Sequence, residues 1–468
     1  MSLWKHQARG VEFALQKFDS HGGCLLAWEM GTGKTRAALE IAKRRGAERM
    51  LVIAPKAVLP VWETEAGKYF TDAPAVLVLN QGTTKTKAKE LALFGSGIVT
   101  VNYESAWREP LATALKHWKP DLLVLDEVHR IKANRGKASR WIGAFATSIE
   151  ARLGLSGTPL AHSPLDIYGL YRALAPDIFP SSYTRFRERY TRPALMSEWY
   201  DDDLIVTAGR GGELQRWKLK GMDDLEEKMY LIADRVKVDD VLDLPESTDE
   251  TIEVQLEPKA KRIYSQIKQD FISDLGGSIV TAANAMVVAL RLSQITGGTL
   301  KDEDEELHEV STAKRDALQD YLKDCGECVV IFGRFRSDLD AIHEAAENAG
   351  LSSSELSGRV NELERWQQGE TSVLVAQNQA GSVGIDLTRA RIAIWYSLSY
   401  SLSEYLQARA RVLRPGQARN VLFKHLIAQS TVDPLIYRAL ESRGKVVDAI
   451  VDGLSSEASG RRSSKQYQ

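Results

Sequence analysis

Residues 25–35 read Leu-Leu-Ala-Trp-Glu-Met-Gly-Thr-Gly-Lys-Thr, which is an apolar run followed by glycines, a lysine and a threonine. This order predicts a strand, a glycine loop and a helix start, as a phosphate-binding loop requires. The glycines let backbone N–H groups turn toward phosphates, Lys34 supplies a positive charge, and the hydroxyl of Thr35 is able to ligate Mg²⁺. The alternative is a chance glycine turn. We predict a nucleotide site formed by Met30, Gly31, Thr32, Gly33, Lys34 and Thr35.

An acidic pair follows the apolar run Leu122–Asp126, downstream of the glycine loop. Parallel α/β sheets bind ligands at the carboxyl ends of their strands, where this pair is expected to lie. There Asp126 is suited to hold Mg²⁺ through water, and Glu127 to orient and deprotonate an attacking water. An acidic pair at a strand end is common by itself. After a phosphate loop it favours catalysis, so Lys34, Asp126 and Glu127 are predicted catalytic residues, and Thr35 and Asp126 are predicted metal ligands.

The neighbouring sequence alternates short apolar runs with helical stretches such as Arg36–Arg44. Runs of this kind are typical of parallel strands that are covered on both faces, so the fold class is α/β with doubly wound sheets. A chain of 468 residues is long enough for two such lobes. The predicted strands of the first lobe are Gly23–Ala27, Met50–Ala54, Ile98–Val101 and Leu122–Asp126. Those of the second are Cys328–Phe332, Thr371–Ala376 and Ile392–Tyr396.

The regions outside these runs set the expected domain boundaries. Residues Ser197–Lys220, rich in charge, tryptophan and glycine, indicate an insertion or connecting element, whereas Pro258–Leu275 and Ala282–Ile295 have helical spacing. The small, polar and basic tail is expected to be disordered. We therefore expect an N-terminal lobe at 1–190, a linker with insertion and helical protrusion at 191–310, a C-terminal lobe at 311–452 and a disordered tail at 453–468.

Arginines suited to complete a nucleotide site occur in the segment Gln407–Gln417. Arg411 and Arg414 lie three apart, which is one helical turn, so both guanidinium groups are expected to point from the second lobe into a cleft. Cations that reach the γ-phosphate only on lobe closure would couple domain motion to catalysis. The alternative is a basic surface helix. We include Arg411 and Arg414 among the predicted catalytic residues.

Bulk composition restricts the other possibilities. The net charge of −2 gives no global sign of nucleic-acid binding, so DNA contacts must be local, with 130–140 and 185–192 as basic candidates or merely as solvated helix faces. Three cysteines suit a reducing compartment, and the pair Cys325 and Cys328 is interpreted as small residues at a strand entrance rather than a zinc site. Neither a membrane span nor a secretory signal is evident, so a cytoplasmic location is expected.

The ordered set of motifs resembles the helicase signature of superfamily two, and specifically its Swi/Snf-like branch of double-stranded DNA translocases. Gln7 is similar to an adenine-reading glutamine, and 27–35 to the first motif. The remaining similar segments, in order, are 53–56 with Trp62, 126–132, 155–159, 235–245, 380–387 and 407–417. The match covers almost the whole chain, and the compact layout is similar to that of bacterial or bacteriophage members.

This resemblance implies two RecA-like lobes with helical protrusions, and ATP and Mg²⁺ as cofactors. Beyond the phosphate loop, it places Gln7, Gly384 and Asp386 at the nucleotide. It also implies a DNA partner, with no membrane and a monomeric state in the absence of DNA. DNA-backbone contacts are expected from Lys56, Asn102, Ser156, Thr158, Arg334 and Ser382.

Three positions depart from the branch pattern. Trp28 stands where Asp is usual, His162 where the coupling motif often continues with Asn, and Asp386 where Asn is frequent. The sequence as a whole predicts an ATP-dependent motor that moves along double-stranded DNA. The alternatives are a strand-separating DNA or RNA helicase, which needs a wedge element, and a nucleotide-dependent clamp or recruiting module in which hydrolysis is incidental.

Overall fold

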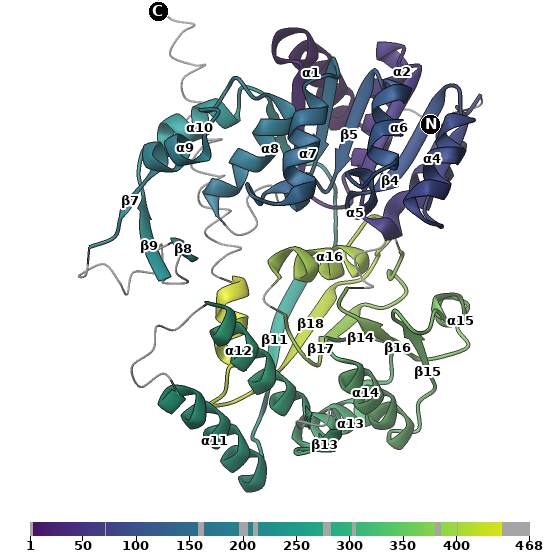
Figure 1. Ribbon diagram of the computed structural model, residues 1–468. Helices are drawn as coiled ribbons and strands as arrows, with labels where there is room; N and C mark the ends of the chain where they lie inside the picture. Colours follow the sequence, from purple (N-terminus) through teal and green to yellow (C-terminus); the bar gives the residue numbers. More distant parts are fainter. Residues whose placement is uncertain are drawn as a thin grey trace, which may run out of the picture. The chain divides into compact units, whose positions relative to one another are not determined.

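The computed structural model describes residues 3–70, 72–157, 163–195, 205–208, 214–274, 282–301, 306–379, 385–399 and 401–441 (Figure 1). For 205–208, 214–216, 270–274 and 282–288 only the backbone is described. The predicted disordered tail at 453–468 lies outside the described residues, as do Thr158, His162, Ser382 and Gly384.

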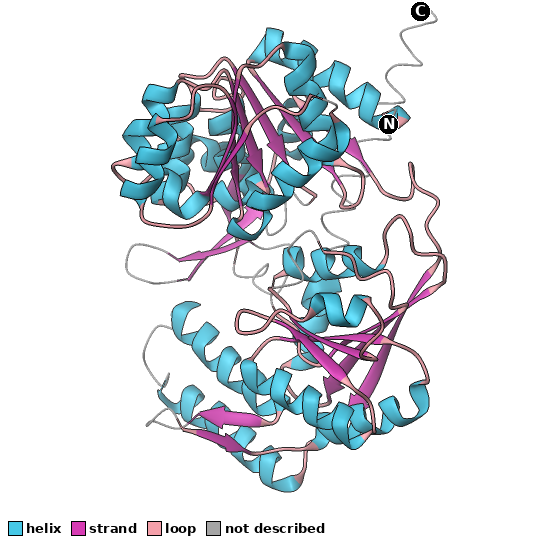
Figure 2. Cartoon of the chain, turned by 90° about the vertical axis from the view of Figure 1, so that its right-hand side faces the viewer, coloured by secondary structure: helices cyan, strands magenta, loops and turns pink. Residues whose placement is uncertain are grey.

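The first sheet has seven strands in the order β10-β1-β6-β5-β2-β4-β3, and every neighbouring pair is parallel. Its central strands are buried on both faces, as a parallel sheet between helical layers requires (Figure 2). The strands are β1 (Gly23–Trp28), β2 (Arg49–Ala54), β3 (Val76–Leu79), β4 (Gly97–Asn102), β5 (Leu122–Asp126), β6 (Ala151–Leu155) and β10 (Ala233–Val236). The accompanying helices are α1 (Lys5–His21), α2 (Lys34–Arg45), α3 (Leu59–Tyr69), α4 (Thr84–Ala92), α5 (Tyr103–Ala106), α6 (Leu111–Trp118), α7 (Lys137–Ala146), α8 (Ile167–Leu174), α9 (Tyr183–Tyr190) and α10 (Met222–Met229).

The second sheet has six strands in the order β11-β18-β17-β14-β16-β15, again with parallel pairs throughout. They are β11 (Ser247–Val254), β14 (Val329–Gly333), β15 (Ser353–Leu356), β16 (Val373–Gln377), β17 (Ile392–Trp395) and β18 (Val421–Ala428). The helices are α11 (Pro258–Asp274), α12 (Ala282–Gly297), α13 (Ala313–Cys325), α14 (Arg336–Asn348), α15 (Leu363–Gln367) and α16 (Leu402–Val412).

Short elements complete the described chain. Two small sheets have the orders β7-β9-β8 and β12-β13. Their strands are β7 (Thr191–Pro193), β8 (Ile205–Ala208), β9 (Leu214–Leu219), β12 (Thr299–Lys301) and β13 (Leu307–Glu309). The 3-10 helices are η1 (Lys56–Val58), η2 (Val128–Ile131) and η3 (Pro164–Asp166). None of the described helices combines the length and the apolar character that crossing a bilayer demands.

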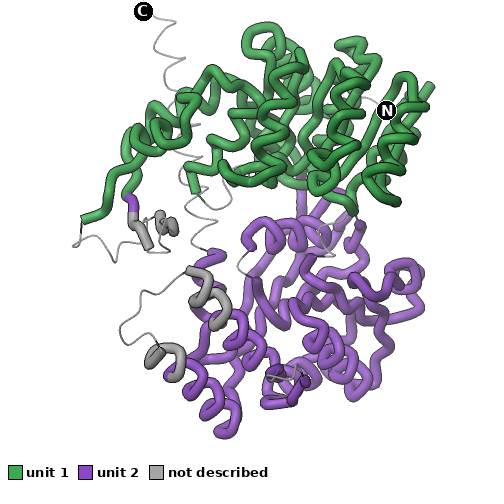
Figure 3. The backbone as a smooth tube through the Cα atoms, in the orientation of Figure 1, with its two compact units in different colours: residues 1–204, 218–242, 454–468 green, residues 205–217, 243–453 purple. Residues whose placement is uncertain are grey.

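The chain divides into two compact units, one from 1–204 with 218–242 and the other from 205–217 with 243–453 (Figure 3). The predicted α/β class with two doubly wound parallel sheets is confirmed. Within the region 191–310, predicted as a linker with insertion and helical protrusion, β10 pairs with the first sheet and β11 with the second. Both are edge strands, and β11 is largely exposed, so neither needs the continuous apolar run by which central strands are predicted.

The cysteine pair lies at the junction of a helix and a strand. Cys325 is the last residue of α13, and Cys328 comes directly before β14. The Cys328 thiol donates a hydrogen bond to the Arg389 carbonyl at 3.1 Å. Within the described ranges, no cluster of three His, Cys, Asp or Glu residues is suited to hold a metal ion.

Candidate nucleotide site

The glycine loop lies between the carboxyl end of β1 and the first residue of α2, as predicted. Gly31 and Gly33 have φ angles of 84° and 77°, in the left-handed region that other residues rarely adopt. Gly33 is also crowded, since a Cβ added there would lie 2.2 Å from Gln7 Nε2. The backbone conformation therefore favours glycine at position 33, and a larger residue there would also displace the Gln7 amide.

Gln7 supports the loop from α1. Its amide nitrogen donates to the carbonyls of Thr32 and Gly33, each at 3.3 Å, and its Oε1 accepts from Trp4 N at 2.9 Å. His6 is a second support, with Nε2 2.8 Å from the Thr32 carbonyl oxygen. Gln7 is thus adjacent to the loop, and its adenine-reading role stays a prediction.

The Lys34 side chain hydrogen-bonds to the backbone of the loop. Its Nζ donates to the carbonyl oxygens of Trp28 and Glu29 at 2.8 and 3.1 Å. The Thr32 hydroxyl also donates to the Glu29 carbonyl, at 2.7 Å. These bonds hold the loop in a closed turn, so a phosphate would have to compete for the Lys34 ammonium.

The acidic pair sits at the end of β5, and Asp126 is only 7% exposed. Trp62 Nε1 donates to Asp126 Oδ2 at 3.2 Å, and Tyr103 donates to the Asp126 carbonyl at 2.8 Å. Burial, and then the charge of Glu127, raise the pKa of Asp126 to about 7, while the charge of Lys34 opposes the rise. Because the charge of Lys34 acts on Asp126, and the loop and the acidic pair both lie at the carboxyl ends of parallel strands, we expect them to form one site.

The residues of this site fit Mg²⁺. The ion prefers hard oxygen ligands, and Asp126 supplies a carboxylate whose burial makes its own ionisation costly. A divalent cation would offset that cost. Thr35, in the first turn of α2, supplies the hydroxyl predicted from the sequence.

His129 connects the acidic pair to β6. Its Nδ1 lies 3.3 Å from Glu127 Oε2 and 3.1 Å from Ser156 Oγ. Burial, the first cause, together with nearby Lys132, lowers the pKa of His129 to about 3, so the imidazole is neutral at physiological pH. Glu127 and Ser156 were predicted as site residues, whereas His129, part of the segment 126–132, was given no role of its own.

The predicted DNA contacts of the first unit differ in accessibility. Lys56 is exposed at the start of η1. Asn102 is buried at the end of β4, where its amide accepts from Lys87 Nζ at 3.3 Å and donates to Glu104 at 2.8 Å. Ser156 is fully buried, with its hydroxyl at His129. Of the three, only Lys56 presents an exposed side chain.

In the second unit, Arg334 follows β14, and its backbone N–H donates to Asp338 Oδ2 at 3.1 Å and to Ser397 Oγ at 2.8 Å. Its guanidinium lies over the Phe335 ring, 5.2 Å from the centroid. Asp386 is exposed, and its Oδ1 accepts from the N–H and the hydroxyl of Thr388 at 2.9 and 2.7 Å. Asp386 is therefore held within its own turn, whereas Arg334 is tied both to α14 and to Ser397 after β17.

The predicted helical spacing of Arg411 and Arg414 is wrong. Helix α16 ends at Val412, and Leu413 has a ψ of 93°, so Arg411 lies in the last turn while Arg414 lies beyond the helix. Arg414 precedes Pro415, and a residue in that position is disfavoured in the α conformation. Instead Arg414 Nη1 donates to the Ile385 carbonyl at 3.0 Å, next to Asp386. The catalytic roles of both arginines stay predictions.

Gln417 holds this turn against the preceding segment, and the sequence analysis gave it no role of its own. Its Nε2 donates to the carbonyls of Ala390 and Thr388 at 2.9 and 3.1 Å. With Arg414 on the Ile385 carbonyl, the turn is pinned at two points to residues 385–390. A single glutamine carries no sequence signal of such a contact.

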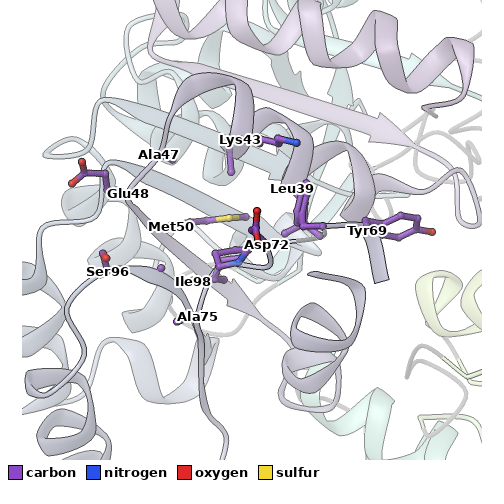
Figure 4. Close-up of a pocket in the computed structure, with 14 residues that line it drawn as sticks. Leu39, Lys43, Ala47, Glu48, Met50, Tyr69, Asp72, Ala75, Ser96 and Ile98 are labelled. Atoms are coloured by element: carbon purple, nitrogen blue, oxygen red, sulfur yellow. The ribbon is translucent and has the colours of Figure 1, made fainter. Parts of the chain in front are cut away.

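A pocket of about 590 Å³ lies at the other edge of the first sheet (Figure 4). Met50 near the start of β2 and Ile98 near the start of β4 contribute to its lining, with Leu39 and Lys43 from α2. The glycine loop follows the carboxyl end of β1, whereas the pocket lies near the amino ends of β2 and β4. Because all strands of this sheet are parallel, the two sites are at opposite ends of the strands. The pocket is therefore separate from the nucleotide site.

Two parallel-sheet units, one of them with a phosphate loop beside a buried acidic pair, define the phosphate-loop class of nucleotide-binding α/β proteins. A family model for the SNF2-related domain matches residues 6–303, and one for the helicase conserved C-terminal domain matches 313–416. The chain belongs to the SNF2-related family.

Similar proteins occur in animals and in a bacteriophage. The chain is 26% identical over 482 residues to the chromodomain-helicase-DNA-binding protein 1-like of Danio rerio, covering 96% of this chain and 44% of that protein. It is 23% identical over 486 residues to the human DNA annealing helicase and endonuclease ZRANB3, covering 99% and 42%. It is also 24% identical over 447 residues to the putative protein p41 of Acyrthosiphon pisum secondary endosymbiont phage 1, covering 91% and 93%.

The chain spans about half or less of the length of the animal relatives. Among solved structures, it is similar to the Sulfolobus solfataricus SWI2/SNF2 ATPase core in complex with dsDNA. The identity is 20%, the coverage is 97% of this chain and 93% of the other, and the TM-score is 0.44.

Proposed function

We propose that this protein is an ATP-driven motor that moves along double-stranded DNA. The observation that carries the proposal is the joint placement of Lys34 and the Asp126–Glu127 pair at the carboxyl edge of one parallel sheet, in a chain of the SNF2-related family. A phosphate loop and an acidic pair at one edge are the parts that ATP hydrolysis needs. Membership of the SNF2-related family, with a helicase C-terminal domain, supports the coupling of hydrolysis to movement on DNA.

In this proposal each residue of the first unit has a distinct chemical role. Lys34 leaves the Trp28 and Glu29 carbonyls to neutralise the β- and γ-phosphates. Asp126 and Thr35 would hold Mg²⁺, which neutralises charge on the phosphates when it is bound. Glu127 orients the attacking water and accepts its proton, and neutral His129 keeps the Glu127 carboxylate in place.

The second unit would supply the cations of the transition state. Arg411 and Arg414 are proposed to stabilise charge on the γ-phosphate, and Gly384 and Asp386 to line the nucleotide. Arg414 is already held by the Ile385 carbonyl, which limits its conformational freedom. A held guanidinium loses less entropy when it meets a phosphate oxygen.

DNA contact is proposed to run along the phosphate backbone without reading bases. Lys56 is the strongest candidate, because its side chain is an exposed cation. The pKa of the buried Lys87 is lowered mainly by burial and also by the charge of Lys56, so the two lysines lie near each other. Asn102, Ser156, Thr158, Arg334 and Ser382 complete the proposed set. For Ser156, the contact with His129 offers a route by which DNA binding would affect Glu127.

The test is ATPase activity with no nucleic acid, single strands, duplex and RNA, with Lys34→Ala as the inactive control. We expect duplex DNA to stimulate hydrolysis most. Displacement of a labelled third strand from a triplex, compared with unwinding of a fork, then separates translocation from strand separation. Fork unwinding without triplex displacement would overturn the translocase proposal, and an ATPase rate indifferent to DNA would favour the clamp.

We also propose that the chain is a monomer before it binds DNA and that it acts in the cytoplasm of a bacterial cell or of a phage-infected host. The similarity to a phage protein over 93% of that protein's length supports the setting. Light scattering of the purified chain with and without duplex DNA tests the oligomeric state. A stable dimer in the absence of DNA would contradict it.

A further inference from the structure

Glu29, the first residue after β1, contacts both the phosphate loop and the segment by which the chain leaves the first unit. Glu29 N donates to the Val236 carbonyl at 2.9 Å, and Glu29 Oε2 accepts from Val238 N at 2.8 Å. Val236 is the last residue of β10, and the chain passes from the first unit to the second after Leu242. We call residues 237–242 the exit segment. Glu29 therefore fastens the exit segment to the start of the phosphate loop.

Lys34 acts on the same peptide group. Its Nζ donates to the Trp28 carbonyl oxygen at 2.8 Å, and the N–H of that peptide group is the Glu29 N–H that bonds to Val236. A charged donor on the carbonyl polarises the peptide and makes its N–H a stronger donor. Lys34 thus strengthens the attachment of Glu29 to β10 for as long as it stays on the loop.

Trp28 fixes the end of β1 against β10 and α1. Its side chain is fully buried, and its Nε1 donates to Asp234 Oδ2 of β10 at 2.7 Å. The ring lies against Gly10 of α1, where an added Cβ would be 2.1 Å from a ring carbon. With β1, β10 and α1 fixed by the indole, movement of the loop is confined to Glu29 and the residues after it.

We propose that Glu29 is a positioning residue that transmits occupancy of the phosphate loop to the exit segment. The inference rests on the proposed function, because it requires a nucleotide to draw Lys34 from the carbonyls of Trp28 and Glu29. Loss of that polarisation weakens the Glu29–Val236 bond, and phosphate charge repels the Glu29 carboxylate from its place on Val238. The exit segment is loosened when nucleotide is bound and fastened when the loop is empty.

Hydrogen exchange of backbone amides on the full chain, with and without Mg²⁺-ADP, tests the inference. The Val238 amide should exchange about threefold faster or more with nucleotide, the change expected for loss of one hydrogen bond. The Leu25 amide, bonded to the Ile232 carbonyl at 2.8 Å in the same strand pair, should be unchanged or slower. General stabilisation by a ligand slows exchange, so acceleration at Val238 alone is diagnostic.

Binding of fluorescent ADP is measured in parallel to separate two kinds of failure. Binding with the Val238 amide unchanged or slowed would overturn the inference and leave the proposed function standing. Absence of binding would overturn the proposed function and the inference with it.

Two variants of Glu29 separate transmission from simple support of the fold. Glu29→Ala removes the acceptor, so Val238 should exchange fast with and without ADP, and kcat with DNA should fall more than KM for ATP changes. Glu29→Gln keeps an oxygen acceptor without charge, so it should restore protection in the empty state and give a smaller response to ADP. If the Val238 amide of Glu29→Ala responded to ADP as in the wild type, the inference would be overturned.

Arg9→Ala is the matched control. Arg9 is an exposed cation that pairs with Asp234 of the same strand at 3.3 Å, and in the described part of the chain it makes no hydrogen bond with Glu29's partners Val236 and Val238. Its loss should leave the response of Val238 to ADP intact. Abolition of that response in Arg9→Ala would attribute the effect to β10 as a whole and overturn the assignment to Glu29.

Discussion

The two units hold their predicted functional residues in different ways. In the first unit, the side chains of Lys34, Asp126 and Glu127 act on one another at a single sheet edge. In the second, the Asp386 carboxylate accepts from Thr388 within its own turn, and Arg414 donates to the Ile385 carbonyl, 29 residues earlier in the chain. The predicted catalytic groups of the first unit therefore influence one another, whereas Asp386 and Arg414 in the second unit are held by backbone groups.

The largest effect that would test this division is expected from Arg414→Ala. If Arg414 stabilises the transition state from its turn, kcat should fall about 10³-fold while ATP affinity changes little, because such a cation acts after binding. Steady-state ATPase and nucleotide titration measure the two. Arg419→Ala is the control, since Arg419 is exposed and pairs with Glu327 at 3.1 Å. Normal turnover by the Arg414 variant would remove it from catalysis.

A somewhat smaller loss is expected from Glu127→Gln in the first unit. The amide keeps the size of the side chain but no longer accepts the proton of the attacking water, so kcat should fall about 10²-fold or more. ATP should still bind, and a single-turnover experiment would show substrate retained without cleavage. Unchanged cleavage in this variant would move the general base elsewhere.

A smaller effect is expected from His129→Ala, which tests whether the imidazole holds the Glu127 carboxylate in position. Without the imidazole, Glu127 loses its contact at 3.3 Å, and kcat should fall about tenfold through misplacement of the base. The pKa of His129 is about 3, so its ionisation should leave no inflection in kcat between pH 5 and 8 in the wild type. An inflection that disappears in His129→Ala would contradict the neutral assignment.

The smallest effect concerns an ion pair of the second unit that has no assigned chemistry. Hydrogen bonds from Arg359, Ser357 and His343 lower the pKa of Glu355 to about 2, against the opposing effect of burial. A depressed pKa stabilises the fold above the unfolded value of 4.5, and that stability is lost as pH falls toward 2.

Glu355→Gln should therefore lower the free energy of unfolding by about 1 kcal/mol at pH 7 and weaken its decline below pH 4.5. Urea titrations across that pH range measure both. Equal pH dependence in the variant and the wild type would show that Glu355 contributes nothing to acid stability.

Much of the fold was predictable because central parallel strands are continuous apolar runs, and Leu122–Asp126 matches β5 at both ends. The edge strands β10 and β11 were missed because β11 is largely exposed and β10 has only four residues, two of them the charged Asp234 and Arg235. Apolar runs alone therefore do not reveal these two strands, which lie in the region 191–310 predicted as linker and protrusion.

The phosphate loop and the acidic pair were predictable because each is contiguous in sequence and its spacing is fixed by the phosphate or metal ion it serves. Contacts between segments that are distant in sequence could not be predicted in this way. The pairing of His129 with Ser156 spans 27 residues, and that of Lys87 with Asn102 spans 15. Arg414 was misplaced because the helical spacing was extended across the position before Pro415, where the α conformation is disfavoured.

The packing of Trp28 against Gly10 makes these two positions interdependent. While the indole fills the space beside α1, even a methyl group at position 10 collides with it. A homologue with a small residue at position 28 is free to carry a larger one at position 10, and grafting either residue alone into this chain would disrupt the fit. Substitutions in the first helix and in the residue before the loop should therefore covary across the lineage.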